Sequence, residues 1–356
     1  MTAETSSGAT EEFPARLVGM FNGAMLTLMI GLGHRAKLFD VMASLPPSSS
    51  LEIAHAAGLD ERYVREWLGA MTTGRIVDHD PVSLTFALPP EHARSLTREA
   101  GSDNLAVMAQ WVGLLAQVED KVLDCFHYGG GVPYGAFPNR LWALEAEASG
   151  VGYDANLIEV TLPSVPGLVE RLRKGIDVAD VACGSGHAIN LMAQAFPASR
   201  FVGLDFSAPA LAAARAEAER LGVTNATFVQ QDAASLEGSQ RYDLITTFDA
   251  VHDQARPDLV LAGIARLLRP GGTYLCVDTA ASSTLADNID HPVGSFLYGS
   301  SCLQCMTVSL AKGGMGLGAM WGKELALGML AEAGFTSVEV VHSEGDWDNL
   351  YVATGT

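Results

Sequence analysis

Basic residues are scarce in this sequence of 356 residues: 22 lysines and arginines face 41 aspartates and glutamates, which leaves a net charge of −19. A chain this acidic repels phosphate backbones, so we expect no nucleic-acid partner. Long apolar runs are missing as well. The most apolar early stretch, residues 17–32, is short and interrupted by glycines, so no membrane span is expected. The chain starts without the basic-then-apolar order of a signal peptide, and its five cysteines are an odd number. Both features favour a cytoplasmic protein with reduced thiols.

The sequence does contain enough apolar surface for a large core. Hydrophobic residues make up 48% of the chain and charged residues 18%, which excludes a disordered protein. The length predicts about two domains. From composition and periodicity we expect a disordered tail at 1–12, a first domain at 13–96, a helical linker at 97–174 and a second domain at 175–356.

The first domain has the pattern of a winged helix-turn-helix. A short helix, a turn at Gly58 and a second helix are followed by two short strands. The second helix, 61–73, places glutamates among its arginines, so it lacks the basic surface of a DNA-reading helix. The predicted elements are two early helices separated near Gly31 and Gly33, a helix at 50–57, the helix at 61–73 capped by Asp60, and antiparallel strands at 76–77 and 84–87.

The second domain alternates short apolar strands with helical patterns, which is typical of a doubly wound α/β fold with a parallel sheet. Two further strands near the end are separated by a polar turn and are expected to pair as a hairpin. The predicted strands are 177–182, 201–205, 226–229, 243–248 and 273–278, followed by 337–341 and 349–353.

Glycines follow the first α/β strand in the segment Asp180–Gly186, where a turn without side chains can pass close under a ligand. Asp205 ends the second strand, where a carboxylate can bind ribose hydroxyls, and Asp232 follows the third strand. Each acid taken alone could instead cap a helix. A nicotinamide-binding fingerprint would need a small residue where Ile189 stands, so that alternative is not favoured.

These motifs, in order, resemble those of class I S-adenosylmethionine-dependent methyltransferases. The resemblance rests on Asp180–Gly186, 201–205, 231–233, 242–244 and 268–272. It implies a Rossmann-like, seven-stranded α/β domain after a mainly helical winged-helix domain, with S-adenosyl-L-methionine as cofactor. Ala182 stands where the family usually has glycine, a departure expected to be mild. The resemblance implies that the turn from Asp180 to Gly186, with Ala182 and Gly184, holds the methionyl part, that Asp205 holds the ribose, and that Asp232 and Ala233 hold the adenine. Phe206, Phe248 and Asp249 are further implied cofactor-binding residues.

His252 lies just beyond the fourth strand, at the edge where such folds bind ligands. The stretch resembles that of small-molecule O-methyltransferases with an N-terminal winged helix, whose histidine is the general base. Asp278 then corresponds to the acid that orients this histidine. The alternative is that His252 lines the cleft without taking a proton. No metal is expected, because Thr279 follows where a third ligand to join Asp249 and Asp278 would be needed.

Residues 279–322 form a long insertion, which we interpret as a possible lid with a mobile glycine-rich loop at 312–319. Cys302 and Cys305 are interpreted as apolar filling of a helix. The linker and the insertion are expected to wall the substrate pocket. The candidate substrate residues are Tyr134, Phe137, Trp142, Tyr298 and Trp321.

We therefore predict methyl transfer to a small, fairly apolar acceptor, most readily at oxygen. The resemblance extends to an uncharacterised actinobacterial, mycobacterium-like group and implies a homodimer formed through the N-terminal domain. Two alternatives stay open. One is a transcriptional regulator that senses S-adenosylmethionine; the other is nitrogen or carbon methylation by proximity alone.

Overall fold

The computed structural model describes residues 7–341 and 347–355. The chain divides between Ala116 and Gln117 into two compact units, each of which is considered by itself. The region expected as a linker, 97–174, crosses this division, so its first part belongs to the N-terminal unit. The tight turn Ala116–Val118 spans the boundary.

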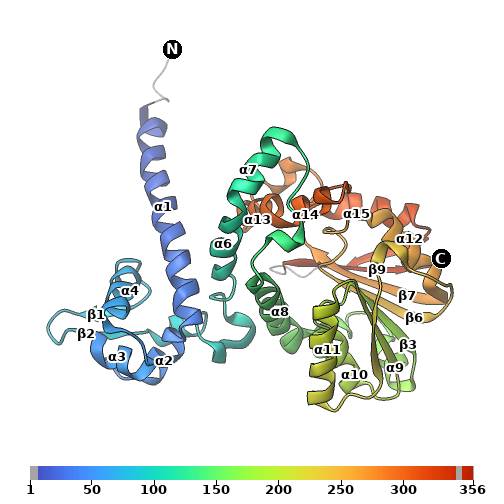
Figure 1. Cartoon of the computed structure of the whole chain (residues 1–356), viewed down its shortest axis with the longest axis horizontal. Helices are drawn as coiled ribbons and strands as arrows, with labels where there is room; N and C mark the ends of the chain where they lie inside the picture. The colour runs from blue at the N-terminus through green and yellow to red at the C-terminus, as the bar shows by residue number, and fades with distance from the viewer. Residues whose placement is uncertain (1–6, 342–346, 356) are drawn as a thin grey trace. The chain divides into compact units, whose positions relative to one another are not determined.

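The N-terminal unit begins with a long helix, α1 (Ser7–Arg35) (Figure 1). This helix corrects two expectations: it starts inside the predicted tail, whose residues 1–6 lie outside the described part, and it continues through Gly31 and Gly33. The break comes at Lys37, whose φ is 58°. A Cβ on Gly33 would lie 2.5 Å from the Trp67 ring, so this glycine permits close packing and does not end the helix.

The continuous α1 also changes the membrane expectation. Within the described residues, its Glu12–Arg35 part is long and apolar enough to cross a membrane, judged by length and composition alone. The sequence argument for too short a stretch is therefore wrong, although one such helix near the N-terminus is weak evidence for a membrane span.

The winged helix-turn-helix is present. Its helices are α2 (Leu38–Ser44), α3 (Ser50–Ala57) and α4 (Glu61–Thr73). Asp60 caps α4 by accepting from the Arg62 amide, as predicted. The wing pairs β1 (Asp78–Asp80) with β2 (Thr85–Ala87), so the first strand follows the predicted 76–77, where Val77 is buried in the core. The unit ends with α5 (Pro90–Ala93), a 3₁₀ turn (Arg98–Asp103) and α6 (Ala109–Leu115).

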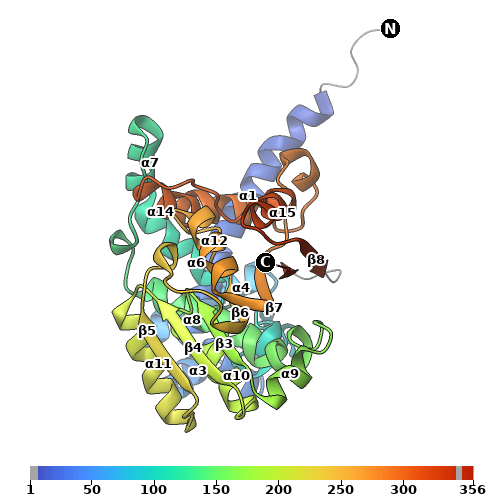
Figure 2. The same ribbon diagram turned by 90° about the vertical axis from the view of Figure 1, so that its right-hand side faces the viewer.

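The C-terminal unit contains a mainly parallel sheet whose seven described strands have the order β5-β4-β3-β6-β7-β9-β8 (Figure 2). The pair β8 and β9 is antiparallel, which confirms the expected hairpin partners, and β9 also runs antiparallel to β7. The strands are β3 (Asp177–Val181), β4 (Arg200–Asp205), β5 (Ala226–Gln230), β6 (Tyr242–Phe248), β7 (Leu268–Thr279), β8 (Ser337–Val341) and β9 (Asp348–Thr354).

Helices cover both faces of this sheet because successive strand residues point to opposite faces. Val178 packs in one apolar cluster with α9, α10 and α11, whereas Ala179 packs in another with α12 and α15. The helices are α7 (Glu119–Tyr128), a short turn (Tyr134–Ala136), α8 (Arg140–Gly152), a π-helical turn (Tyr153–Thr161), α9 (Leu168–Lys174), α10 (His187–Ala195), α11 (Ala208–Leu221), a turn (Ala233–Ser235), α12 (Pro257–Leu267) and α15 (Gly322–Glu332).

The insertion after β7 is helical. It contains a 3₁₀ turn (Leu285–Asn288), α13 (Gly294–Ser300), a π-helical turn (Ser301–Cys305) and α14 (Met306–Ala311). The glycine-rich segment that follows is held by its backbone, where the expectation was a mobile loop: the Met315 and Gly318 amides donate to the Ala255 and His252 carbonyls at 3.0 and 3.2 Å. The insertion therefore supports the loop that carries His252.

Gly131 packs directly against α14, and replacing it tests this contact. A Cβ at Gly131 would overlap the Thr307 carbonyl and the Ala311 amide. We expect Gly131→Ala to lower the free energy of unfolding by about 1–3 kcal/mol, measured by chemical denaturation. Gly135→Ala is the matched control, because a Cβ there meets nothing within 4 Å. Equal effects of the two substitutions would contradict the packing argument.

Candidate active site

The carboxyl ends of the parallel strands collect the candidate residues at one edge of the sheet. Strands β4, β3, β6 and β7 lie side by side in that order, and all four run in the same direction. The turns after them therefore meet at one edge, which is where ligands bind in open α/β sheets.

The glycine turn after β3 is bonded to the end of β4. The Gly184 amide donates to Asp205 Oδ2 at 2.9 Å, and the Ser207 amide donates to the other oxygen at 2.7 Å. Asp205 is buried, and burial raises its pKa although both amide bonds oppose this. The predicted turn and the predicted ribose acid are thus brought together.

Asp180 is buried at the end of β3, where the Thr246 hydroxyl donates to its Oδ1 at 2.7 Å. Burial raises the pKa of Asp180 to about 7, with the Thr246 bond opposing and the Asp205 charge adding to the rise. Because no cation is among the groups that set this pKa, the carboxyl is suited to a positively charged ligand group.

Two residues other than glycine next to this turn have left-handed backbone. Ala182 has a φ of 59° and Asp249 a φ of 49°. Such conformations cost roughly 1–3 kcal/mol outside glycine. The alanine at 182 is therefore more strained than the mild departure expected from the sequence, and Asp249 adds a second strained residue at the same edge.

The other predicted cofactor residues differ in their contacts and in their exposure. Asp232 caps the Ala233–Ser235 turn by accepting from the Ala234 amide at 2.9 Å, so the capping alternative does apply to it here. Phe248 forms an edge contact with Tyr153 at 5.2 Å between ring centroids, and Phe206 is half exposed. Their roles toward a cofactor stay predictions.

His252 and Asp278 are in contact, as predicted. Nδ1 of His252 lies 2.6 Å from Asp278 Oδ1, and both side chains are buried. The Thr279 amide and the Trp321 indole N–H donate to the same oxygen at 2.9 and 3.2 Å. Asp278 is therefore held in place, and it fixes the imidazole with Nε2 directed away from the pair.

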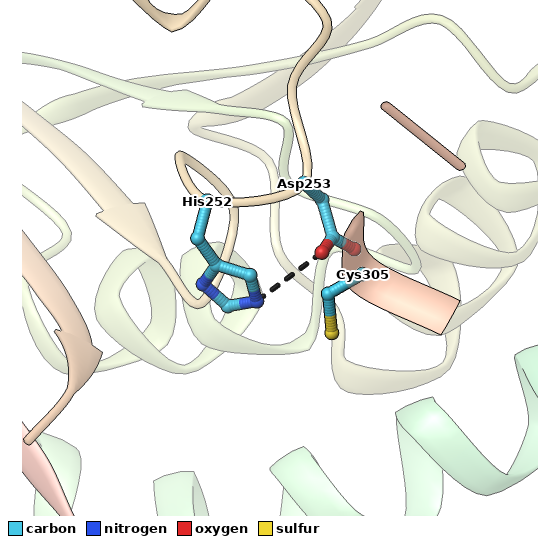
Figure 3. A group of neighbouring side chains, drawn as sticks. All are labelled: His252, Asp253 and Cys305. Carbon is cyan, nitrogen blue, oxygen red and sulfur yellow. Dashed lines mark ion pairs between the residues drawn. The ribbon is translucent and has the colours of Figure 1, made fainter. Parts of the chain in front are cut away.

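The Nε2 atom of His252 faces Asp253, at 3.2 Å from its Oδ1 (Figure 3). Burial alone would lower the pKa of His252, but the carboxylates of Asp278 and Asp253 outweigh burial and raise the pKa well above its ordinary value. The other oxygen of Asp253 accepts from the Tyr134 hydroxyl at 2.9 Å. In this arrangement the imidazole is a cation between two acids.

Three of the five candidate substrate residues form an aromatic group. Tyr134 stacks on Trp142 at 4.9 Å between centroids and lies 6.3 Å from Phe137. Trp321 has a different place: it is buried in the core and contacts the histidine pair through Asp278. The Tyr298 hydroxyl lies 3.2 Å from Asn288 inside the insertion.

Sequence reasoning missed two half-buried residues at this site. Cys305, interpreted as helix filling, lies with its thiol beside His252 and Asp253. Glu145 on α8 accepts from Gln304 at 2.7 Å, and burial, with the nearby charge of Asp253, raises its pKa to about 8. Cys305 lies in a Cys-x-x-Cys spacing that was interpreted as helix filling, whereas Glu145 belongs to no spaced motif and left no signal in the sequence.

Two family models match the chain, an Rv2258c-like winged HTH domain at residues 24–98 and a methyltransferase domain at residues 172–334. Among curated relatives, a fatty-acid O-methyltransferase from Mycolicibacterium smegmatis is 31% identical over 106 residues, which are 30% of this chain and 38% of the relative. An uncharacterised methyltransferase from Synechocystis is 36% identical over 107 residues, 29% of this chain and 47% of the relative. The chain thus spans less than half the length of these relatives.

Solved structures are similar over nearly the whole chain. Human N-acetylserotonin methyltransferase in complex with S-adenosylmethionine has a TM-score of 0.72 at 15% identity, covering 100% of both chains. The mitomycin 7-O-methyltransferase MmcR has a TM-score of 0.70 at 15% identity, covering 99% of this chain and 100% of its own. At such identities the likeness concerns the fold, and it confirms the predicted fold class. The chain therefore matches an Rv2258c-like winged HTH domain followed by a methyltransferase domain, and its fold is that of a methyltransferase solved with S-adenosylmethionine.

Proposed function

We propose that this protein transfers a methyl group from S-adenosylmethionine to an oxygen of a small, fairly apolar acceptor. The observation that carries the proposal is the buried His252–Asp278 pair at 2.6 Å, at the strand edge that also holds the Gly184–Asp205 turn. A proton acceptor of this kind is needed when a hydroxyl is methylated.

The residues at the turn suit the cofactor. Asp180 would face its amino group, Asp205 its ribose, and Asp232 with Ala233 its adenine. The buried Asp180 and Asp205 carboxyls have raised pKa values because they are desolvated, and a cationic ligand that donates hydrogen bonds relieves exactly that cost. When bound, S-adenosylmethionine supplies a methyl group activated by a sulfonium.

His252 would remove the acceptor's proton. An acceptor hydroxyl placed between Nε2 and Asp253 replaces the 3.2 Å ion pair, and the removal of this carboxylate lowers the pKa of the imidazole. The neutral imidazole would then take the hydroxyl proton at Nε2, as the acceptor oxygen gains the methyl group and the cofactor's methyl–sulfur bond breaks to leave a thioether. Asp278, in contact with Nδ1, stabilises the imidazolium that forms.

The acceptor class follows from the aromatic group of Tyr134, Phe137 and Trp142, which offers flat apolar surface. The test is turnover of labelled S-adenosylmethionine against phenols, flavonoid-like compounds and quinols. Methyl ethers among the products support the proposal. Calorimetry without heat for either S-adenosylmethionine or its demethylated product would contradict it.

Cofactor affinity should depend on pH through Asp180. Its pKa of about 7 means that, below this pH, binding the cofactor's amino group must first ionise the carboxyl. We expect affinity to fall about tenfold per pH unit below pH 7 and to be flat above it. Calorimetry of the wild type and of Asp180→Asn checks this, because the nearby Asp205 titrates in both proteins and only the Asp180 contribution disappears. An identical slope in the two proteins would contradict the assignment.

The regulator alternative is not favoured by the helix that would read DNA. On α4, Arg62 pairs with Glu66 at 2.5 Å and Arg65 with Glu61 at 3.1 Å, so both arginines are already neutralised. We propose a small-molecule enzyme of the cytoplasm without a nucleic-acid partner. A specific, salt-resistant complex in a gel-shift assay would contradict this.

We also propose that α1 forms a homodimer. Its exposed apolar residues Val18, Phe21, Met25 and Leu32 follow helical spacing and make one stripe. We expect the double variant Phe21→Glu/Met25→Glu to be a monomer by light scattering where the wild type is a dimer. Val82→Glu, at a residue 90% exposed on the wing, is the control. A monomeric wild type, or one that sediments with lipid vesicles through this stripe, would contradict the dimer.

A further inference from the structure

Three side chains with different metal-binding atoms meet beside the candidate base. His252 and Asp253 come from the loop after β6, and Cys305 comes from the π-helical turn of the insertion (Figure 3). One ligand atom of each lies within 4.8 Å of the others. Imidazole nitrogen, carboxylate oxygen and thiolate sulfur are the ligands of Zn²⁺ in proteins.

The separations are close to those of a tetrahedral site. Bonds of about 2.0–2.3 Å to Zn²⁺ put neighbouring ligand atoms about 3.3–3.7 Å apart. The His252 Nε2 to Asp253 Oδ1 distance is already 3.2 Å. A closure of about 1 Å by the Cys305 side chain completes such a geometry, and three protein ligands leave the fourth position open.

The surroundings of the ligands also match a metal site. A histidine that binds metal commonly donates its second ring N–H to a carboxylate, and Nδ1 of His252 lies 2.6 Å from Asp278. A ligating carboxylate is in turn hydrogen-bonded, as Asp253 is by Tyr134 at 2.9 Å. The Oδ1 atom of Asp253 is buried, and it faces Nε2 of His252 at 3.2 Å. The His252–Asp278 and Asp253–Tyr134 contacts do not involve Cys305, so they support the metal site separately from the grouping of the three ligands.

We propose that His252, Asp253 and Cys305 form a binding site for a divalent transition metal of the Zn²⁺ class. This departs from the sequence-based expectation of no metal, which considered Asp249 and Asp278 as ligands and interpreted Cys305 as apolar filling of a helix. The binding does not depend on the proposed function. Its consequence does rest on it: Nε2 cannot hold a metal and accept a proton at once, so an occupied site withholds the base from the acceptor.

The test is a titration of the reduced full-length protein with Co²⁺, followed by competition with Zn²⁺. We expect thiolate-to-cobalt absorption in the near ultraviolet that Zn²⁺ abolishes. Cys305→Ser should lose this band and bind Zn²⁺ at least about 100-fold more weakly, since even partners of metal ligands contribute 10- to 100-fold. Cys302→Ser, three residues away in the same turn, should keep both properties.

Calorimetry with S-adenosylmethionine on the same samples shows whether each variant is folded and separates the two proposals. Absence of the band in wild type, or its equal loss in both cysteine variants, overturns the metal site and leaves the methyltransferase proposal intact. A cobalt band in a protein that fails to bind S-adenosylmethionine overturns the proposed function alone.

Discussion

Replacing His252 by glutamine should lower turnover by about 10²- to 10⁴-fold, the usual contribution of general base catalysis. The glutamine amide can still donate to Asp278, which also accepts from the Thr279 amide and the Trp321 indole N–H, so the buried carboxylate keeps its donors. The affinity for S-adenosylmethionine should be nearly unchanged, because the cofactor residues lie on the neighbouring turns. Calorimetry for binding and initial rates with the best acceptor measure the two quantities separately.

The pH profile gives a second readout for His252. Since the carboxylates of Asp278 and Asp253 raise the pKa of the imidazole and only the neutral form accepts a proton, turnover of the wild type should rise with pH. His92→Gln is the control, as His92 contacts the Ile76 carbonyl in the N-terminal unit. Unchanged turnover in His252→Gln would remove the base and favour nitrogen or carbon methylation by proximity.

Replacing Asp205 by alanine should weaken S-adenosylmethionine binding by about 100-fold, which corresponds to about 3 kcal/mol for the lost charge-assisted bonds to a ribose. The substitution also frees the Gly184 and Ser207 amides that Asp205 now accepts from at 2.9 and 2.7 Å. The turn then loses one of the contacts that join it to β4, so both direct bonding and part of the preorganisation are removed. Calorimetry measures the affinity.

Two further variants interpret the Asp205 result. Asp205→Asn keeps one acceptor oxygen and should show an intermediate loss. Glu219→Ala removes the same charge from the exposed surface of α11 and should leave the affinity unchanged, because surface charges in salt are screened. If Glu219→Ala weakened binding as much as Asp205→Ala, net charge rather than the site would be the cause.

Much of the fold could be predicted because its signals are local. The strands of the α/β domain, the cap at Asp60 and the turn at Asp180–Gly186 each depend on neighbouring residues in the chain. The errors arose where local signals are ambiguous. Gly33 reads as a helix break, but in the structure it accommodates the Trp67 ring, a neighbour from a different helix.

Some contacts of the site could also be predicted from the sequence, and others could not. Parallel strands deliver their carboxyl ends to one edge, so the approach of Asp205 to Gly184 and of His252 to Asp278 follows from strand order and could be expected beforehand. The role of Asp232 could not be predicted, because a residue that caps the following turn and a residue that binds adenine are both an aspartate at this position.

The sequence by itself determined the two-domain plan, the glycine turn with its acids, and the histidine with its orienting acid, because spacing along a strand or helix specifies which face a side chain occupies. Tertiary structure alone decided which residues of the insertion and of the linker helix lie beside His252 and Asp253. Cys305 and Glu145 reach His252 and Asp253 through the packing of an insertion and a linker helix whose apolar patterns do not specify their partners. Packing is governed by shape and burial over the whole unit, so contacts between distant segments leave no periodic mark in the sequence.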